Sequence, residues 1–199
     1  MMVAVEGMDG AGKTTVCNYV SKKYNFQIME RPTKYFFEND NQQIDLDRYV
    51  SYLKKIYSSD KFIRSIFFGF GNMVAINKAK NEDTVLDRHI VSNYFWNGDE
   101  AYISFYSELI EIIGKPTLTI LLHASPDTRF KRIFERDGED IDLLDKDVFI
   151  DGTSKMIWFL EKFDFSYVYI DTDKMTKEEV FEKVDRIIAG LKLGSEKSV

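Results

Sequence analysis

The sequence predicts an α/β fold of three layers, with a five-stranded parallel sheet between two layers of helices. Short apolar runs rich in β-forming residues alternate with helical segments along the 199 residues, as in repeated strand–helix–strand units. The run at 117–122 is continuously apolar, which is typical of a central strand buried on both faces. A glycine-rich loop joins the first run to the first helical segment.

Each expected strand is a short run of apolar or β-branched residues. The expected strands lie at residues 2–5, 26–29, 84–86, 117–122 and 167–170. Helices are expected at residues 13–24, 45–58, 60–80, 99–113 and 145–162, and further helices begin near 125 and 177.

Start and stop signals support these boundaries in chain order. Gly114 ends the helix that precedes the central strand. Ser125 and Pro126 open the next helix, as an N-cap residue and a first-turn proline. Thr176 and Glu179 form a capping box in front of the last helix.

The composition indicates one folded domain and excludes several classes of protein. Apolar residues make up 44% of the chain and aromatic residues 15%, so we expect one domain over 1–193 and a frayed tail over 194–199. The net charge of −6 argues against a general nucleic-acid binder. We find no apolar run long enough to span a membrane and no signal peptide. The one cysteine, Cys17, is expected to be a buried apolar residue. These features predict a cytoplasmic protein without a membrane partner.

The glycine-rich loop carries the strongest functional signal. Residues 7–14 read G-x-x-x-x-G-K-T between a strand and a helix, which is the P-loop pattern of phosphate binding. Its glycines let backbone N–H groups point at phosphate oxygens, and the helix N-terminus adds partial positive charge. Lys13 can reach the β- and γ-phosphates, and the Thr14 hydroxyl can bind Mg²⁺. We therefore expect a P-loop NTPase fold, the alternative being a plain glycine-rich turn.

Two charged pairs follow predicted strands. Asp87 can support Mg²⁺, directly or through water, and Arg88 beside it offers a planar fork for an anionic group. Arg31 is a candidate phosphate clamp and Glu30 a candidate hydroxyl-binding residue or base, because ligands of open α/β sheets sit at the carboxyl ends of strands. The alternatives are a surface ion pair for the first pair and a charged turn fixed by Pro32 for the second.

Three arginines recur at helical spacing after the central strand. Arg129, Arg132 and Arg136 fall along one side of the expected helix, and an acidic, glycine-containing stretch follows. Phosphoryl transfer needs cations over the transferring group, so the pattern predicts a short arginine-bearing lid near 132–145. The alternative is a solvated helix face of mixed charge.

Together these segments resemble a known family. Residues 6–15, E-G-M-D-G-A-G-K-T-T, resemble the thymidylate kinase P-loop, which typically reads E-G-x-[DE]-G-A-G-K-[ST]-T. Residues 87–98 resemble that family's D-R-Y-x-x-S-x-x-A-Y-Q-G segment. Two further segments resemble parts of the same family: Glu30-Arg31, and the strand at 169–171 with the last helix. The resemblance therefore spans nearly the whole chain.

The resemblance implies transfer of the γ-phosphoryl of ATP to the 5′-phosphate of thymidylate, with Mg²⁺, by a homodimeric nucleoside monophosphate kinase. Its implied catalytic residues are Lys13, Asp9, Arg88 and Arg136, with Thr14 and Asp87 at the metal. Its implied ATP-binding residues are Gly7, Gly10, Ala11, Gly12, Lys13, Thr14, Thr15 and Arg132. Its implied acceptor-binding residues are Asp9, Glu30, Arg31, Phe67, Phe68, Arg88 and Trp96.

Some positions depart from the thymidylate kinase pattern. No arginine follows the phenylalanines within 69–72, and His89 stands in place of the usual tyrosine. The segment 87–93 also resembles the D-R-Y-I-F-x-S-N segment of deoxynucleoside kinases, and 124–136 resembles their lid region. That resemblance implies a nucleoside acceptor, with Glu30 as general base. Which of Phe67, Phe68 and Phe70 stacks on the base stays open.

A P-loop switch without a small-molecule acceptor is a further alternative. Guanine-specific switches carry N-K-x-D, whereas residues 77–80 read N-K-A-K and lack the aspartate. Two histidines and one cysteine form no zinc pattern, and we expect His123, at the end of the central strand, to be a packing residue.

Overall fold

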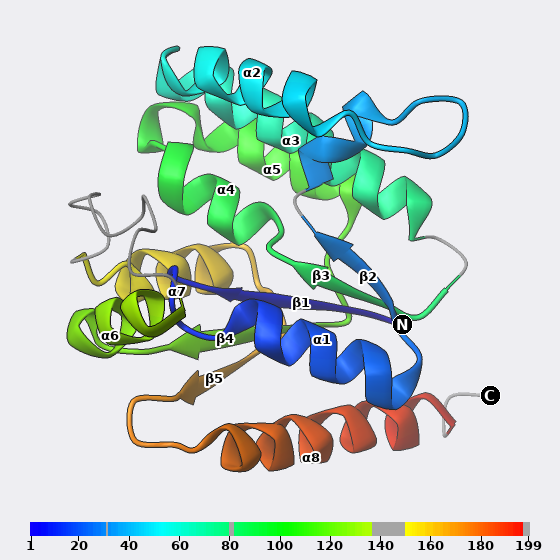
Figure 1. Cartoon of the computed structure of the whole chain (residues 1–199), viewed down its shortest axis with the longest axis vertical. Helices are drawn as coiled ribbons and strands as arrows, with labels where there is room; N and C mark the ends of the chain where they lie inside the picture. Colours follow the sequence, from blue (N-terminus) through cyan, green and yellow to red (C-terminus); the bar gives the residue numbers. More distant parts are fainter. Residues whose placement is uncertain (31, 80–81, 137–149, 197–199) are drawn as a thin grey trace.

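The computed structural model describes residues 1–30, 32–79, 82–136 and 150–196. Five strands form a single parallel sheet in the order β2-β3-β1-β4-β5 (Figure 1). The strands are β1 (Met2–Gly7), β2 (Gln27–Glu30), β3 (Thr84–Asp87), β4 (Leu118–His123) and β5 (Tyr167–Asp171). The predicted five-stranded parallel sheet is therefore confirmed, with each strand within a residue or two of its expected place.

The register brings the functional segments to one edge of the sheet. β1 occupies the centre, where Val5 pairs with Asp87 of β3 and with Ile120 of β4. Glu30, the last residue of β2, pairs in register with Asp87. Because parallel strands share their carboxyl-terminal edge, the P-loop and both charged pairs begin at the same edge.

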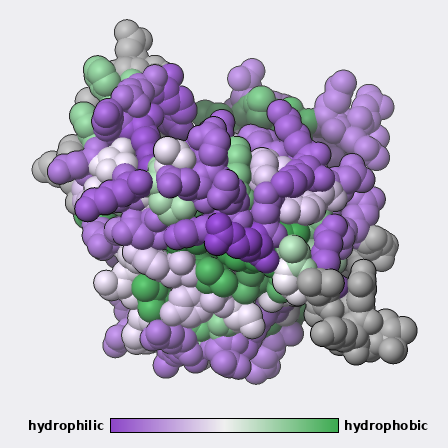
Figure 2. All heavy atoms as spheres, turned by 90° about the horizontal axis from the view of Figure 1, so that it is seen from below, coloured by the Kyte–Doolittle hydropathy of each residue, from purple (hydrophilic) through white to green (hydrophobic). Residues whose placement is uncertain are grey.

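One face of the sheet is covered by α1 (Lys13–Tyr24) and α8 (Lys177–Glu196). Cys17 of α1 and Val184 of α8 are fully buried against apolar side chains of the inner strands. Cys17 is thus a core residue, as predicted. Figure 2 shows the molecule from below, the side on which α8 lies in Figure 1; hydrophilic residues cover much of this surface, and smaller hydrophobic areas lie between them.

The other face is covered by α4 (Ile90–Asn97), α5 (Ile103–Ile113) and α7 (Thr153–Lys162), which form an aromatic-rich core with Leu121 of β4. Tyr106 and Phe159 are fully buried there. The sheet therefore lies between two helical layers, as the sequence predicts (Figure 1).

Two further helices extend the second layer. They are α2 (Leu46–Tyr57) and α3 (Lys61–Lys78), and a 3-10 turn, η1 (Pro32–Phe37), packs against α3. α2 packs against α3, and Ile76 of α3 packs against Met29 of β2 and Leu86 of β3. Asp45 and Asp60 cap these helices by accepting backbone N–H groups of Arg48 and Ile63.

The helix boundaries expected from sequence are met at α1 and at the start of α8, lie within two residues for α2 and α3, and are shifted further at the starts of α5 and α7. A 3-10 turn, η2 (Glu100–Tyr102), opens the segment expected to be helical from residue 99. α7 begins at Thr153 and not at 145, and residues 145–149 lie outside the described part of the chain. α4 and η1 were not predicted. None of the helices in the described residues is long and apolar enough to cross a membrane.

Candidate functional site

The P-loop follows β1 and takes a conformation that requires glycine. Gly7, Gly10 and Gly12 have φ values of +139°, +81° and +98°, a region that residues with a side chain rarely adopt. A Cβ at Gly10 would lie 2.7 Å from the backbone oxygen of Arg129, so the loop rests directly on that residue. A Cβ at Gly12 would meet no atom within 4 Å, so this side of the loop is open. Ala11 packs into the core beneath it.

Lys13 begins α1 and is almost completely buried. Its ammonium donates to the Met8 carbonyl at 2.8 Å and lies 3.6 Å from a carboxylate oxygen of Asp9. Burial, together with the nearby Arg88 guanidinium, lowers the pKa of Lys13 to about 8. The side chain is therefore a cation whose charge is only partly compensated by the protein.

Thr14 and Asp87 meet although they come from α1 and β3. The Thr14 hydroxyl donates to Oδ2 of Asp87 at 2.6 Å, and Asp87 itself is buried. The two proposed metal ligands are thus brought together at the edge of the sheet. Thr15, the next residue of α1, is exposed.

Arg88 faces the P-loop from the other side. Its guanidinium forms an ion pair with Asp9 and donates to Ser92 Oγ at 3.4 Å. Burial acts to raise the pKa of Asp9, but Arg88 and Lys13 outweigh burial and lower that pKa. Arg88 has φ +75°, an uncommon value for a residue with a side chain. The Arg88 backbone is therefore held in a strained form at the site.

Glu6 holds the segment after Arg88 in place, a role that the sequence did not reveal. This fully buried carboxylate accepts the His89 N–H at 2.7 Å, the Ser92 N–H at 3.3 Å and the Ser92 hydroxyl. It thereby caps the N-terminus of α4. Burial raises the pKa of Glu6. The available signal was a lone carboxylate inside an apolar strand, which requires polar partners.

Of the second charged pair, Glu30 lies in the described part of the chain. The Glu30 side chain is 41% exposed and lies 3.6 Å from the Lys34 ammonium. Its register with Asp87 places it beside the proposed metal ligands. Arg31 lies outside the described residues.

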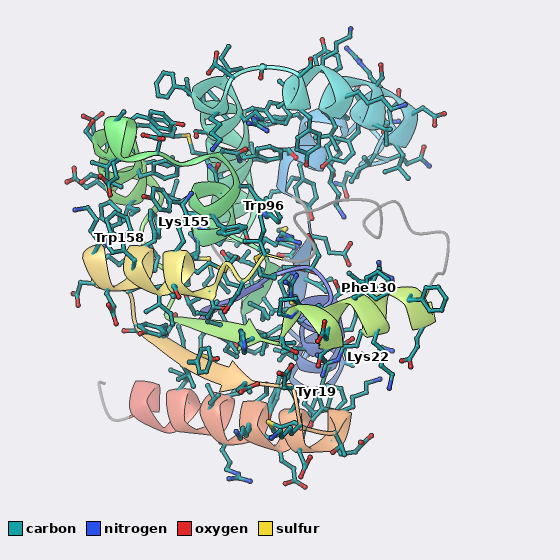
Figure 3. The ribbon with its side chains drawn as sticks, turned by 90° about the vertical axis from the view of Figure 1, so that its left-hand side faces the viewer. Tyr19, Lys22, Trp96, Phe130, Lys155 and Trp158 are labelled. Atoms are coloured by element: carbon teal, nitrogen blue, oxygen red, sulfur yellow. The ribbon has the colours of Figure 1, made fainter. Side chains whose placement is uncertain are left out.

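The aromatic candidates lie on α3 and α4. Phe67 and Phe68 are partly buried with ring centroids 5.3 Å apart, whereas Phe70 is 54% exposed. Trp96 is partly buried, packs edge-on against Phe95 at 4.7 Å, and lies near the middle of the view in Figure 3. Phe67 also packs against Phe36, and Phe68 against Tyr57, so both rings have neighbours within the protein.

Two buried polar side chains nearby have no hydrogen-bond partner among the described residues. They are Asn72 of α3, through Nδ2, and His89, through both ring nitrogens. Burial lowers the pKa of His89 to about 4, so the ring is neutral near pH 7.

The arginines of α6 (Pro126–Arg136) fall along one side of a helix, as their spacing predicts, but their side chains have different surroundings. Arg129 is fully buried under the P-loop, and Arg132 donates to the Thr172 hydroxyl at 3.0 Å and carbonyl at 2.8 Å. Arg136 is exposed at the end of the helix. The expectation that Arg129 belongs to an open rim of arginines was wrong, because its side chain is buried. Spacing alone could not show that α6 packs so closely on the P-loop. Of the predicted lid near 132–145, residues 137–145 lie outside the described part.

His123 is only partly a packing residue. Its ring stacks near Tyr169, and Nδ1 lies 2.8 Å from Thr153 Oγ1. It also lies with Asp171 and Asp173, each offering one ligand atom within 4.8 Å of the others. Asp171 is the last residue of β5 and Asp173 lies just beyond it, and no sequence pattern joins either of them to His123.

Comparison with known proteins gives a consistent result. A family model described as thymidylate kinase matches residues 5–184. The probable thymidylate kinase of Archaeoglobus fulgidus is 28% identical over 209 residues and covers 94% of each chain. The cytidylate kinase of Methanococcus maripaludis is 24% identical over 199 residues, covering 96% of this chain and 99% of that protein.

Solved structures share the fold. The deoxyadenosine kinase of M. mycoides with the products dCMP and a flexible dCDP superposes with a TM-score of 0.69 at 19% identity, covering 96% of this chain and 100% of that one. The same enzyme with bound dATP gives a TM-score of 0.64 at 21% identity, covering 95% of this chain and 100% of that one.

Proposed function

The chain belongs to the thymidylate kinase family, and we propose that it transfers the γ-phosphoryl of ATP to a deoxynucleoside monophosphate, most specifically thymidylate. The observation that carries this proposal is the contact of Lys13 and Arg88 with one carboxylate, that of Asp9. A donor-side cation and an acceptor-side cation are thereby adjacent. Two phosphates bound to them would be close enough to react.

The donor side would be formed by the P-loop and α6. The loop N–H groups and Lys13 would hold the β- and γ-phosphates, and Arg132 and Arg136 would face the rest of ATP. Phosphate charge would stabilise the Lys13 ammonium, whose pKa burial lowers to about 8. Lys13 would then carry its full charge when the nucleotide is bound.

The acceptor side would be formed by the ends of β2 and β3 and by the aromatic residues above them. Arg31 and Arg88 would hold the acceptor phosphate, and Asp9 would approach the sugar hydroxyl. Phe67 or Phe68 would stack on the base, with Trp96 at its edge. Catalysis would rest on positioning and on electrostatic stabilisation, because phosphoryl transfer needs little covalent help from a protein.

The residues fit Mg²⁺ as the accompanying metal. The Thr14 hydroxyl and the Asp87 carboxylate, 2.6 Å apart, are hard oxygen ligands of the kind that Mg²⁺ prefers. Mg²⁺ would neutralise charge on the phosphates, and Thr14 and Asp87 would hold it directly or through water.

A deoxynucleoside kinase is the second candidate, and Glu30 favours it. Its carboxylate is 41% exposed and lies at the same sheet edge as Asp87. A nucleoside acceptor must lose its 5′-hydroxyl proton to a base, whereas a monophosphate acceptor has no such need.

The deciding experiment pairs each deoxynucleoside with its own 5′-monophosphate and measures ATP consumption with Mg²⁺. Activity on thymidylate but not on thymidine supports the first candidate. Activity on nucleosides alone, abolished by Glu30→Gln, supports the second. If the protein binds nucleotide but turns over no acceptor, both kinase candidates are excluded, and a P-loop switch is the remaining hypothesis.

We also propose that the enzyme is a homodimer, as the family resemblance implies. Several apolar side chains on α2 and α3 are more than 40% exposed: Leu46, Val50, Tyr57, Ile63 and Phe70. A single monomeric species in light scattering across micromolar concentrations would contradict this.

A further inference from the structure

Arg129 is the largest fully buried side chain of the described residues, and it lies under the P-loop. Its guanidinium donates to three backbone carbonyls: Ala124 from Nε at 3.2 Å, Asp9 from Nη1 at 3.3 Å, and Ile150 from Nη2 at 2.7 Å. These carbonyls belong to the end of β4, to the P-loop and to the segment before α7. One side chain therefore ties together three parts of the chain.

The environment of Arg129 is unusual for a residue that only fills space. Among the described residues, no carboxylate lies within ion-pair distance of its guanidinium. Burial lowers the pKa of Arg129 although Asp9 and Asp151 oppose this effect. Among the described residues its hydrogen-bond acceptors are carbonyls, and burying such a cation costs stability that an apolar side chain of similar volume would not. A role beyond packing is therefore the better explanation for an arginine here.

The contacts of Arg129 fix the peptide between Asp9 and Gly10. The Asp9 carbonyl is bonded to the guanidinium, and Gly10 lies so close that a Cβ there would come within 2.9 Å of the Arg129 Cα. In a trans peptide the carbonyl and the following N–H point in opposite directions. Anchoring the Asp9 carbonyl to Arg129 therefore turns the Gly10 N–H away from α6.

The hydrogen bond from Arg129 to the Asp9 carbonyl also constrains where the Asp9 side chain lies. The Asp9 carboxylate contacts Lys13 and Arg88, so the position of the Asp9 backbone sets the distance between the two cations. α6 also carries Arg132 and Arg136. Arg129 thus joins the helix that bears them to the loop that would hold the phosphates.

We infer that Arg129 is a positioning residue for the phosphate-binding loop, holding the Asp9–Gly10 peptide in the orientation that receives nucleotide phosphates. This inference rests on the proposed function as an ATP-dependent kinase. Arg129 touches no reacting atom itself. Its effect should appear in nucleotide affinity, which packing alone would not change.

The test is ADP affinity by calorimetry, with Mg²⁺, for the wild type and Arg129→Met. Loss of a charged hydrogen bond that orients the loop should raise the Kd for ADP by about tenfold or more. Lys155→Met is the matched control, because Lys155 of α7 is also a partly buried cation that donates to two carbonyls, Phe95 and Gly98 (Figure 3). It should lower Tm and leave the Kd for ADP unchanged.

The outcomes separate this inference from the proposed function. If the wild type binds ADP and folded Arg129→Met binds it within twofold of the wild-type Kd, the inference is overturned and the kinase assignment stands. If the wild type binds neither ADP nor ATP, both are overturned. Should Arg129→Met not fold, Arg129→Gln replaces it, because its short amide cannot span three carbonyls. An unchanged Kd in folded Arg129→Gln would likewise overturn the inference.

Chemical rescue gives a second measurement. Guanidinium ion at low millimolar concentration should restore part of the ADP affinity of Arg129→Ala, since it can occupy the vacated site. It should not improve the wild type or Lys155→Met.

Discussion

The Thr14 hydroxyl donates to the Asp87 carboxylate at 2.6 Å, across 73 residues of sequence. This contact joins the first turn of α1 to the end of β3. It orients both oxygen groups toward each other before any ligand arrives, which reduces the ordering that binding would require. Several measurable consequences follow from this contact and its neighbours.

Asp87→Asn should weaken the use of Mg²⁺. The substitution removes the negative charge and leaves an amide whose oxygen is a poorer ligand, so the Mg²⁺ concentration for half-maximal activity should rise about tenfold or more. Asp83→Asn is the control, because Asp83 is an exposed carboxylate at the other end of β3. A Mg²⁺ titration in which both variants match the wild type would remove Asp87 from the metal site.

Lys13→Ala should lose turnover with every acceptor. A buried ammonium beside the transferring phosphate acts in the transition state, so we expect kcat to fall by about 10²-fold or more. Lys22→Ala, an exposed lysine on the same helix, should retain wild-type kcat. Near-normal turnover of Lys13→Ala at saturating substrate would contradict the proposed mechanism.

Nucleotide affinity should fall at alkaline pH. In the free protein the pKa of Lys13 is about 8, and bound phosphates would raise it, so binding above pH 8 takes up a proton. Affinity should therefore decrease as pH rises above 8, by up to about tenfold per pH unit. In Lys13→Arg the charge persists, so this decrease should vanish. A wild-type Kd that stays flat from pH 8 to 9.5 would be inconsistent with the buried ammonium.

His89 should make the protein sensitive to acid. Its pKa is lowered from 6.5 to about 4 by burial, so between these values the unfolded state binds one more proton. Stability is then lost as pH falls from 6.5 to 4, by about 3 kcal/mol in total. Urea unfolding of His89→Phe should show a shallower acid loss than the wild type. If the unfolding free energy of both proteins falls equally with pH, the His89 ring is not buried as a neutral group.

Glu6→Ala should disturb both stability and acceptor use. It leaves two backbone N–H groups and the Ser92 hydroxyl without their buried acceptor, at a cost of about 3 kcal/mol or more. Because Ser92 also accepts from Arg88, the KM for the acceptor should rise more than the KM for ATP. Glu6→Gln keeps an acceptor oxygen and should be milder. Equal changes in both KM values would limit Glu6 to a structural role.

The sequence predicted those features whose determinants are local. The P-loop, α1 and the capped helices α2 and α3 depend on residues within a few positions of one another, and all were found where expected. The alternation of apolar strand segments with helical segments was sufficient to predict the parallel sheet. Thr14 and Asp87 were each predicted as metal ligands, and the structure adds the hydrogen bond between them.

What was missed depends on distant partners. α4 is short, its residues are weak helix formers, and its cap comes from Glu6, 83 residues before His89. Arg129 was grouped with Arg132 and Arg136 because spacing cannot distinguish a side chain that faces solvent from one that enters a neighbouring loop. Similarly, nothing local joins Arg132 to Thr172.

The order of the strands also constrains how the protein is made. β1, the first of the five strands in the sequence, lies in the middle of the sheet, and its partners β3 and β4 end at residues 87 and 123. β1 therefore has no partner until residue 87 has been synthesised and only one until residue 123 has, because parallel pairing needs these later segments. The P-loop gains its anchor at Arg129 only after that. We conclude that the proposed nucleotide site is completed only after the helix that carries Arg129 has been made, and that the nascent chain must meanwhile keep an apolar strand from pairing elsewhere.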